Sequence, residues 1–264
     1  MLEAVIFDVD GTVVDTFARQ ESWFKTWAAQ NAVAWPFSSS AEFRAFYNNH
    51  INRTGGVQNV YDELHLSCNL KDKTHPVWPA YEAFNQQTPS FLYSGMKETI
   101  TQIWEMGQLN QQTTRNRRLR LGINTTNSWR SIYGDLERAG VLPYFDCFVT
   151  EEILREYQGA GNGDALKKPS KVSLALALGL MDCNGAQTLH IGDTLNDLRA
   201  SQKIIRLRPQ KPETVITVGA CYGYEGWEVL ERGVETASGR CTFDYLIDQP
   251  QELIAIVQKN LEEK

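Results

Sequence analysis

The chain has few of the features that mark secreted, membrane-spanning or metal-thiolate proteins. Its five cysteines are odd in number, widely spaced and never arranged as a CxxC pair, which predicts free thiols rather than a disulfide framework or a zinc site. The first residues carry no basic leader, and no apolar run reaches the length that spans a membrane. These absences predict a cytoplasmic protein without a membrane partner.

Positive charge is not in excess either. The 264 residues carry a formal net charge of -6, which argues against a nucleic-acid partner and against binding to an anionic membrane surface. With 42% hydrophobic and 22% charged residues, the composition is that of a folded globular protein with a substantial core. The composition therefore favours chemistry on small molecules.

Hydrophobic spacing separates the chain into two kinds of segment. The apolar run Ala4–Phe7 is too short for a helix and predicts a buried strand. From Thr16 to about Phe91, apolar and aromatic residues recur at three- and four-residue spacing, which predicts an all-helical segment. We interpret its aromatic residues as a helical core rather than a cofactor site.

After Pro89, strand and helix patterns alternate. Strands are predicted at Leu119–Ile123, Cys147–Thr150, Thr188–Ile191 and Val215–Val218. Helices are predicted around Met96–Met106, Trp129–Ala139, Val172–Leu180, Leu195–Lys203 and Pro250–Asn260. Surface loops are predicted at Gln108–Arg118, Gln158–Lys167, Arg208–Glu213 and Val234–Arg240. The alternation predicts an α/β fold with a doubly wound parallel sheet, formed by residues 1–15 and 93–264, and an inserted helical domain at 16–92.

Two aspartates follow the first predicted strand. Asp8 and Asp10 stand just beyond its carboxyl end, where open parallel sheets bind their ligands. A calcium-binding loop starting at Asp8 would need glycine and glutamate where the chain has Val13 and Arg19, so that alternative fails. The remaining alternatives are a solvated turn and a carboxylate pair held by a cation.

A second acidic pair, Asp193 and Asp197, follows the predicted strand Thr188–Ile191. Four-residue spacing at a helix start puts both side chains on one face near the positive helix end, although acidic residues there are also common as plain caps. Two strand ends that each carry paired carboxylates can converge on one hard divalent cation. Oxygen ligands of this kind suit Mg²⁺ rather than zinc.

Two further residues are placed where they can bind an anion. Lys168 precedes Pro169 immediately before the predicted helix Val172–Leu180. Thr125 follows the predicted strand Leu119–Ile123, where a hydroxyl and backbone N–H groups can bind an anionic oxygen. Taken alone, a Lys-Pro dipeptide is common and mostly structural, and the threonine would be a helix cap.

Together these residues resemble the motifs of the haloacid dehalogenase superfamily of phosphohydrolases. The segment Phe7–Thr16, FDVDGTVVDT, is similar to the family signature FDxDGTLxD. The second, third and fourth motifs match at Thr125, Lys168-Pro169 and Gly192–Asp197. The resemblance covers about residues 1–16 and 93–258. The helical insert has the position and type of the cap in the phosphoglycolate phosphatase and β-phosphoglucomutase-like branch.

The resemblance implies a covalent reaction. Asp8 would attack phosphorus and form an aspartyl-phosphate, while Asp10 would protonate the leaving oxygen and then deprotonate the attacking water. Mg²⁺ would be held by Asp8, Asp10 and Asp193, with Asp197 as a further metal ligand or an outer carboxylate. Asp10 also favours phosphoryl transfer over dehalogenation, because a halide leaving group needs no proton.

The same resemblance implies supporting roles for other residues. Thr125 would hold a phosphoryl oxygen, Lys168 would orient the nucleophile and balance its charge, and Thr12 would bind substrate or position the acid–base group. A register shift of one residue would make Thr126 the functional hydroxyl. Lys167 is the alternative to its neighbour Lys168.

Substrate choice is expected in the helical insert, at the loop Asn52–Gly56. Arg53 is the candidate there for a substrate carboxylate or second phosphate, because a guanidinium binds such groups through two hydrogen bonds. The alternative is a solvated arginine beside a glycine pair.

The implied function is a Mg²⁺-dependent phosphatase of a small phosphorylated metabolite. One alternative is a phosphomutase of the β-phosphoglucomutase type, which needs the same residues. Another is a phosphate-sensing or scaffolding module without turnover, which has little need for Asp10. The substrate and the choice between monomer and homodimer do not follow from the sequence.

Overall fold

The computed structural model describes residues 2–51, 56–72, 74–114, 118–159, 163–206, 213–237 and 239–262. Contacts divide the chain into two compact units. An α/β unit comprises Met1–Asp15 and Phe91–Lys264, and a helical unit comprises Thr16–Ser90. The sequence places the corresponding boundaries at 15/16 and 92/93.

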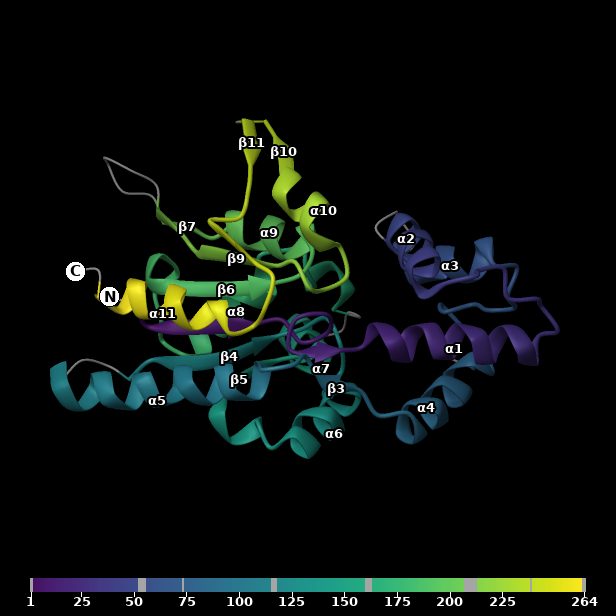
Figure 1. The fold of residues 1–264 in the computed structure, drawn as a ribbon, viewed down its shortest axis with the longest axis horizontal. Helices are drawn as coiled ribbons and strands as arrows, with labels where there is room; N and C mark the ends of the chain where they lie inside the picture. Colours follow the sequence, from purple (N-terminus) through teal and green to yellow (C-terminus); the bar gives the residue numbers. More distant parts are fainter. Residues whose placement is uncertain are drawn as a thin grey trace. The chain divides into compact units, whose positions relative to one another are not determined.

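Within the described residues of the α/β unit, six strands form the main sheet. In spatial order they are β12 (Tyr245–Ile247), β9 (Ile216–Ala220), β6 (Thr188–Gly192), β1 (Ala4–Phe7), β4 (Arg120–Asn124) and β5 (Cys147–Val149). All neighbouring strands run parallel. The chain moves outward from β1 through β4 to β5, then returns to the other side of β1 for β6, β9 and β12 (Figure 1). This confirms the doubly wound parallel sheet, with its reversal of strand order beside β1.

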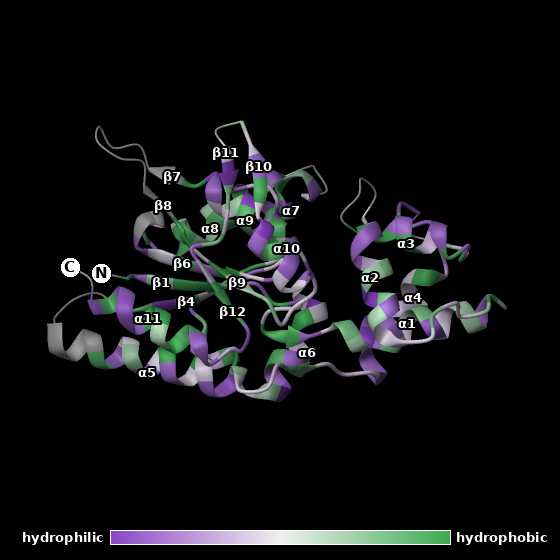
Figure 2. Ribbon diagram, turned by 45° about the horizontal axis from the view of Figure 1, so that its top comes forward, coloured by the Kyte–Doolittle hydropathy of each residue, from purple (hydrophilic) through white to green (hydrophobic). Residues whose placement is uncertain are grey.

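The central strand β1 is buried on both faces, and all four of its residues are 0% exposed. Val5 and Phe7 face one layer of helices, whereas Ala4 and Ile6 face the other, as the alternation of side chains along a strand requires. The first layer contains α5 (Met96–Thr114), α6 (Trp129–Ala139) and α11 (Glu252–Glu262). The second contains α7 (Glu151–Gln158) and α8 (Val172–Leu180). Figure 2 shows the hydrophobic strands between these helices.

Two more helices lie in the described part of the α/β unit. They are α9 (Leu195–Gln202), which packs on β6 and β9, and α10 (Gly226–Arg232), which packs on β12. Leu198 of α9 and Leu230 of α10 share a small buried cluster. Because α9 follows β6 directly, its first turn lies at the carboxyl edge of the sheet.

Helix α6 illustrates how local chemistry fixes the element boundaries. The Ser128 hydroxyl accepts a hydrogen bond from the Ser131 backbone N–H at 3.2 Å and caps the first turn. Gly140, with φ of 70°, ends the helix in a left-handed conformation that suits glycine. The bounds of α6 and α8 agree with the predicted helices.

Two predicted loops are wrong. The stretch Gln108–Arg118 continues α5 as far as Thr114, because a polar run without proline can propagate an existing helix. The stretch Val234–Arg240 lies in an antiparallel pair, β10 (Val234–Thr236) with β11 (Gly239–Cys241). Residues 115–117, 160–162, 208–212 and 238 of the predicted loops lie outside the described residues.

Several short elements have no counterpart in the predictions. They include α7, α10, β12 and the pairs β2 (Val14–Asp15) with β3 (Phe91–Leu92) and β7 (Ile205–Arg206) with β8 (Glu213–Thr214). One-turn 3-10 helices lie at Leu142–Tyr144, Asp164–Leu166 and Gly185–Gln187. Elements this short give too few periods for a pattern to be detected. All five cysteines are free thiols, as their spacing predicts.

The described part of the helical unit is built around aromatic side chains. Its helices are α1 (Phe17–Gln30), α2 (Ser40–Ile51), α3 (Val57–Glu63) and α4 (Val77–Gln87). Phe43 is 0% exposed and packs against the rings of Phe24 and Trp35, with centroid distances of 5.7 and 4.9 Å. The Trp23 indole N–H donates to the Tyr61 hydroxyl at 2.6 Å. Across the described parts of both units, no helix is both long and apolar enough to cross a membrane.

Candidate active site

Asp8 lies directly beyond β1, in the middle of the sheet. Its backbone N–H donates to the Ile191 carbonyl oxygen of β6 at 2.9 Å, which extends the parallel ladder by one residue. The residue is 7% exposed, and its Oδ1 accepts a hydrogen bond from Lys168 Nζ at 2.6 Å. The end of the central strand therefore presents a largely desolvated carboxylate paired with a lysine.

Lys168 joins two carboxylates. Its Nζ lies 2.6 Å from Asp8 Oδ1 and 2.6 Å from Asp197 Oδ1, and its side chain is only 5% exposed. The neighbouring Lys167 pairs with Glu151 and Asp164 instead, at 3.2 and 3.0 Å. The structure thus brings Lys168 to the predicted site and holds Lys167 on other acidic residues.

Asp193 and Asp197 come from the end of β6 and from the first turn of α9. Asp193 is 0% exposed. Its Oδ1 accepts from the Thr12 hydroxyl at 3.2 Å, and its Oδ2 accepts from the Tyr224 backbone N–H at 2.7 Å. Asp197 Oδ2 accepts from the N–H and the hydroxyl of Thr194 at 3.1 and 2.7 Å. Asp197 therefore caps α9 with one oxygen while the other binds the lysine.

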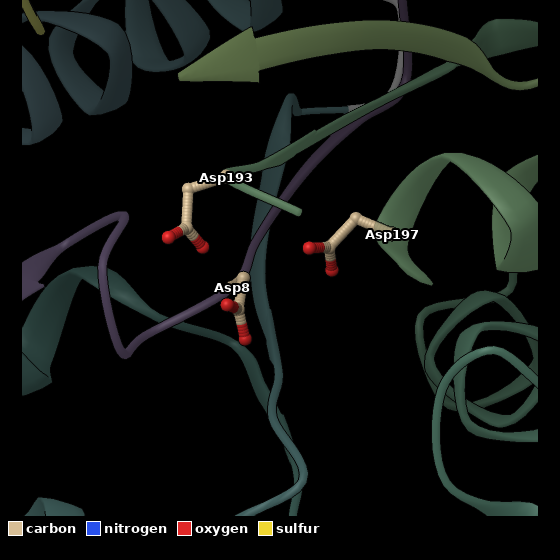
Figure 3. Close-up of side chains that lie close together, drawn as sticks. All are labelled: Asp8, Asp193 and Asp197. Atoms are coloured by element: carbon tan, nitrogen blue, oxygen red, sulfur yellow. The ribbon is translucent and has the colours of Figure 1, made fainter. Parts of the chain in front are cut away.

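The side chains of Asp8, Asp193 and Asp197 form one acidic cluster (Figure 3). Each contributes a carboxylate oxygen, and these three oxygens lie within 4.8 Å of one another. Of the side chains that the structure describes, no other group of three or more His, Cys, Asp or Glu residues brings its ligand atoms this close. The cluster assembles residues almost 190 positions apart in the sequence, because β1 and β6 are neighbours.

Burial makes the full negative charge of this cluster costly. It raises the pKa of Asp8 to about 7. Repulsion from Asp197 adds to this rise, whereas attraction to Lys168 opposes it. Burial also raises the pKa of Asp193 well above its usual value, with Asp8 and Asp197 adding to the rise. Three buried carboxylates face one ammonium group here, so a further positive charge is needed before all three ionise at neutral pH.

The other buried groups are a protonated lysine, an ionised aspartate and a neutral histidine. Burial would lower the pKa of Lys168, but Asp197 and Asp8 raise it above its usual value. Burial would raise the pKa of Asp197, but Lys168 and hydrogen bonds hold it below its usual value. Burial lowers the pKa of His190 to about 4, and its Nδ1 lies 2.7 Å from Ser201 Oγ. Lys168 and Asp197 are therefore a charged pair, and His190 is a neutral core residue.

Asp10 lies outside the acidic cluster. It is partly buried, and its Oδ2 accepts a hydrogen bond from Asn127 Nδ2 at 2.7 Å. The Asn127 backbone N–H in turn donates to Thr125 Oγ1 at 3.1 Å. The turn after β4 therefore holds the carboxylate of the turn after β1, and keeps it separate from the three clustered carboxylates.

The predicted threonines occupy different environments. Thr12 is 0% exposed and its hydroxyl donates to Asp193. Thr125 is 1% exposed, and its backbone N–H donates to the Val149 carbonyl oxygen at 3.0 Å. Thr126 is exposed. Arg53, the predicted substrate residue of the helical insert, lies outside the described residues.

Two contributors to the site are absent from the predictions. Asn127 reaches Asp10, and the loop Cys221–Glu225 reaches Asp193 through the Tyr224 N–H. Both follow strands whose carboxyl ends lie on the same edge of the sheet as Asp8. Ligands of open parallel sheets bind at the carboxyl ends of the strands. Since the strands Leu119–Ile123 and Val215–Val218 are predicted, the residues that follow them could have been named as candidates.

The donor set of the cluster fits a hard divalent cation. All of its ligand atoms are carboxylate oxygens from three buried side chains, and oxygen is the donor that hard cations prefer. Burial, together with the neighbouring carboxylates, raises the pKa values of Asp8 and Asp193, and among the described residues Lys168 is the one ammonium group that contacts the cluster. A dication would supply further positive charge.

Comparison with known proteins agrees with this geometry. The family model described as haloacid dehalogenase-like hydrolase matches residues 2–204. The phosphoglycolate phosphatase of Nitrosococcus oceani is 24% identical over 203 residues, which are 76% of this chain and 79% of that protein. The probable phosphatase IndB of Dickeya dadantii is 26% identical over 202 residues, 75% of this chain and 76% of that protein.

Solved structures share the fold as well. The putative β-phosphoglucomutase of Thermotoga maritima superposes with a TM-score of 0.63 and 15% sequence identity, covering 98% of this chain and 99% of the other. At this identity the similarity concerns the fold. It agrees with the resemblance that the sequence motifs carry.

Proposed function

The chain belongs to the haloacid dehalogenase-like hydrolase family, and we propose that it is a Mg²⁺-dependent phosphatase of a small phosphate monoester. One observation carries the proposal. Lys168 Nζ lies 2.6 Å from both Asp8 and Asp197, within a buried cluster of three carboxylates at the carboxyl edge of the sheet. A purely structural site has no need for so much uncompensated negative charge.

Asp8 is the nucleophile in this proposal. Its carboxylate oxygen attacks phosphorus, the bond from phosphorus to the substrate oxygen breaks, and an aspartyl-phosphate forms. Water then attacks the phosphorus, and inorganic phosphate leaves while the Asp8 carboxylate is restored. Lys168 fixes the direction of the Asp8 side chain and offsets the charge that gathers on the phosphoryl oxygens.

Asp10 is the proton-transferring group. It protonates the leaving oxygen in the first step and removes a proton from the attacking water in the second. Its hydrogen bond to Asn127 leaves the side chain outside the acidic cluster, so its oxygens are not among those of the three clustered carboxylates. Thr125, buried at the end of β4, binds a phosphoryl oxygen.

The side chains of Asp8 and Asp193, with the backbone carbonyl of Asp10, would hold the Mg²⁺ ion. When bound, it supplies charge that reduces the repulsion between the carboxylate nucleophile and the phosphate. Asp197 is assigned to Lys168 rather than to the metal, because the Lys168 ammonium already offsets its charge. Both groups that donate to Asp193 are neutral. Thr12 supports Asp193 through its hydroxyl.

The helical unit, Thr16–Ser90, is proposed to act as the cap that selects the substrate and excludes water during the reaction. Arg53 remains the candidate there for a second anionic group on the substrate. Replacing Arg53 by methionine should raise KM for a substrate with a second anionic group. The same replacement should leave KM nearly unchanged for a substrate without one.

Release of inorganic phosphate from a panel of phosphorylated metabolites tests the proposal. The panel starts with 2-phosphoglycolate, because the Nitrosococcus oceani relative is named for it, and continues with sugar phosphates. We expect release that depends on Mg²⁺ and stops in excess EDTA. Activity that survives complete chelation, or silence across the panel, would overturn it. Conversion of a sugar phosphate to its isomer without phosphate release would show a phosphomutase instead.

A further inference from the structure

The loop that follows β9, residues Cys221–Glu225, contacts two parts of the acidic site. The Tyr224 backbone N–H donates to Asp193 Oδ2 at 2.7 Å. The Tyr222 hydroxyl donates to the Thr12 carbonyl oxygen at 3.1 Å. We call this segment the β9 loop. It contacts both Asp193 and the turn that carries Asp10 and Thr12, although it lies in a different segment of the chain from either.

The middle of the β9 loop has no room for a side chain. A Cβ atom on Gly223 would lie 2.3 Å from Asp193 Cβ, 2.6 Å from Asp193 Oδ2 and 2.4 Å from the Gly11 carbonyl oxygen. These distances are far below van der Waals contact, and one of the neighbours is rigid backbone. The loop therefore packs directly against the carboxylate, and only glycine permits that approach.

Gly11 packs against the same carboxylate oxygen. A Cβ atom on Gly11 would lie 2.0 Å from Asp193 Oδ2 and 2.4 Å from Tyr224 Cδ2. Its φ of 82° is left-handed, a second reason for glycine at this position. Two glycines therefore pack closely against Asp193, while Tyr224 donates to one carboxylate oxygen and Thr12 to the other.

The β9 loop also reaches the helix that carries Asp197. Glu225 Oε2 accepts a hydrogen bond from the Leu195 backbone N–H at 2.7 Å, at the first residue of α9. An acidic side chain at this end of a helix satisfies a backbone donor and interacts favourably with the helix dipole. The five residues of the β9 loop therefore contact the turn after β1, Asp193 and the start of α9.

We propose that the β9 loop sets the metal affinity of the site, with Gly223 and Tyr222 as positioning residues that hold the Asp193 carboxylate and the Asp10–Thr12 turn in place. This inference rests on the proposed function, in which Asp193 and the Asp10 carbonyl hold Mg²⁺. Residues that orient metal ligands contribute to affinity because they spare the ligands a conformational search. Neither residue is among the proposed ligands of the ion.

Titration calorimetry with Mg²⁺ tests the inference on the full chain. Gly223→Ala should weaken Mg²⁺ binding by about 10-fold to 100-fold, the range found when groups that orient metal ligands are removed. Tyr222→Phe removes one hydroxyl and should weaken binding by about threefold to tenfold, which is roughly the effect of one lost hydrogen bond.

Two matched controls accompany these variants. Gly134→Ala changes a glycine of α6 whose added Cβ would have no atom within 4 Å. Tyr245→Phe removes a hydroxyl that binds Lys259 at 3.3 Å, away from the acidic site. Both controls should bind Mg²⁺ within about twofold of the wild type. Circular dichroism and the Tm without metal report whether each variant folds.

The outcomes separate the inference from the proposed function. Wild-type affinity in both Gly223→Ala and Tyr222→Phe would overturn the inference while leaving the metal site in place. If Asp193→Asn bound Mg²⁺ as tightly as the wild type, the proposed metal site itself would fall. If Gly223→Ala did not fold, Tyr222→Phe against Tyr245→Phe would decide the question alone.

Discussion

The two units of this chain use their buried side chains in opposite ways. In the α/β unit, Asp8, Asp193 and Lys168 are charged or ionisable groups gathered at one place. In the helical unit, the gathered side chains are aromatic rings around Phe43, and a buried acid such as Glu21 is paired with its helical neighbour Lys25 at 2.6 Å. The α/β unit therefore gathers several buried charged groups at one place, whereas in the helical unit the buried acid Glu21 forms a separate ion pair with Lys25.

The difference follows from backbone geometry. Parallel strands end at a common edge, where the next residue of each strand leaves the hydrophobic layer while still close to its neighbours. Residues from distant parts of the sequence can then meet with little water between them. Helices present a stripe of side chains every three or four residues, and the inward stripes of α1 and α2 meet as a continuous apolar core. Chemistry is therefore expected at the strand ends and packing among the helices.

The largest expected effect is that of Asp8→Asn. An amide cannot attack phosphorus, so phosphate release should fall by on the order of 10⁴-fold. The fold should persist, because the substitution removes a buried charge without changing the size of the side chain. Steady-state phosphate assays and circular dichroism measure the two effects. Substantial activity in this variant would mean that another residue is the nucleophile. It would contradict the assignment of the chemistry to the strand ends of the α/β unit.

Next in size is the loss of the charge pairing at Lys168. Lys168→Met leaves two buried carboxylates without their cation and should lower the free energy of unfolding by about 3 to 5 kcal/mol at pH 8 without metal. Urea denaturation measures the change. Lys167→Met is the matched control, since that lysine pairs with the more exposed Glu151 and Asp164, and should cost about 1 kcal/mol or less. Equal effects would contradict the central role of Lys168.

The aromatic core of the helical unit predicts an effect on stability without an effect on metal binding. Phe43→Ala removes a ring that is 0% exposed and should lower the free energy of unfolding of that unit by about 3 kcal/mol. Its Mg²⁺ affinity, measured by calorimetry, should equal that of the wild type. Phe91→Ala, at a side chain that is 70% exposed, should change neither quantity. Weakened metal binding in Phe43→Ala would assign the aromatic core a role in the site.

The last expected effect is a pH dependence of the metal-free protein. The pKa of Asp8 is about 7 in the folded protein against 3.8 for the free side chain, so between these values the folded state binds more protons than the unfolded state. Asp8 therefore makes stability fall as pH rises from about 4 to 7, by at most about 1.4 kcal/mol per pH unit.

Urea denaturation of wild type and Asp8→Asn across this pH range isolates that contribution. The stability difference should grow in favour of Asp8→Asn as pH rises, and saturating Mg²⁺ should reduce the growth. His190 contributes with the opposite sign, because its lowered pKa of about 4 makes stability fall below pH 6.5. It is common to both proteins and cancels in the difference. A difference that does not vary with pH would contradict the raised pKa of Asp8.

Much of the α/β unit follows from local sequence patterns. The run Ala4–Phe7 is a strand in the structure with the predicted bounds, and the helices Trp129–Ala139 and Val172–Leu180 match as well. These segments have clear apolar periods or caps. The polar run Gln108–Thr114 lacks both, so its assignment to α5 depends on the helix that precedes it.

The candidate site likewise contains residues that the sequence identifies and residues that only the fold brings into place. Asp8 and Asp193 can be recognised because each follows an apolar strand within a distinctive motif. The pairing of Asp197 with Lys168 depends on where the segments before α8 and at the start of α9 place the two side chains. Asn127 and Gly223 have no motif, because each acts through one contact with a residue far away in the sequence.

The sequence by itself determined the alternation of strands and helices, the helical insert and the acidic residues at the strand ends, because hydrophobic period and residue type are local properties. Only the tertiary structure decided which carboxylates share one charge cluster, that Lys168 pairs with Asp197 as well as with Asp8, and which loop packs against Asp193. Those outcomes depend on burial and on distances between atoms of remote segments, and strand order sets both. The energy of a buried charge is fixed by its neighbours in space.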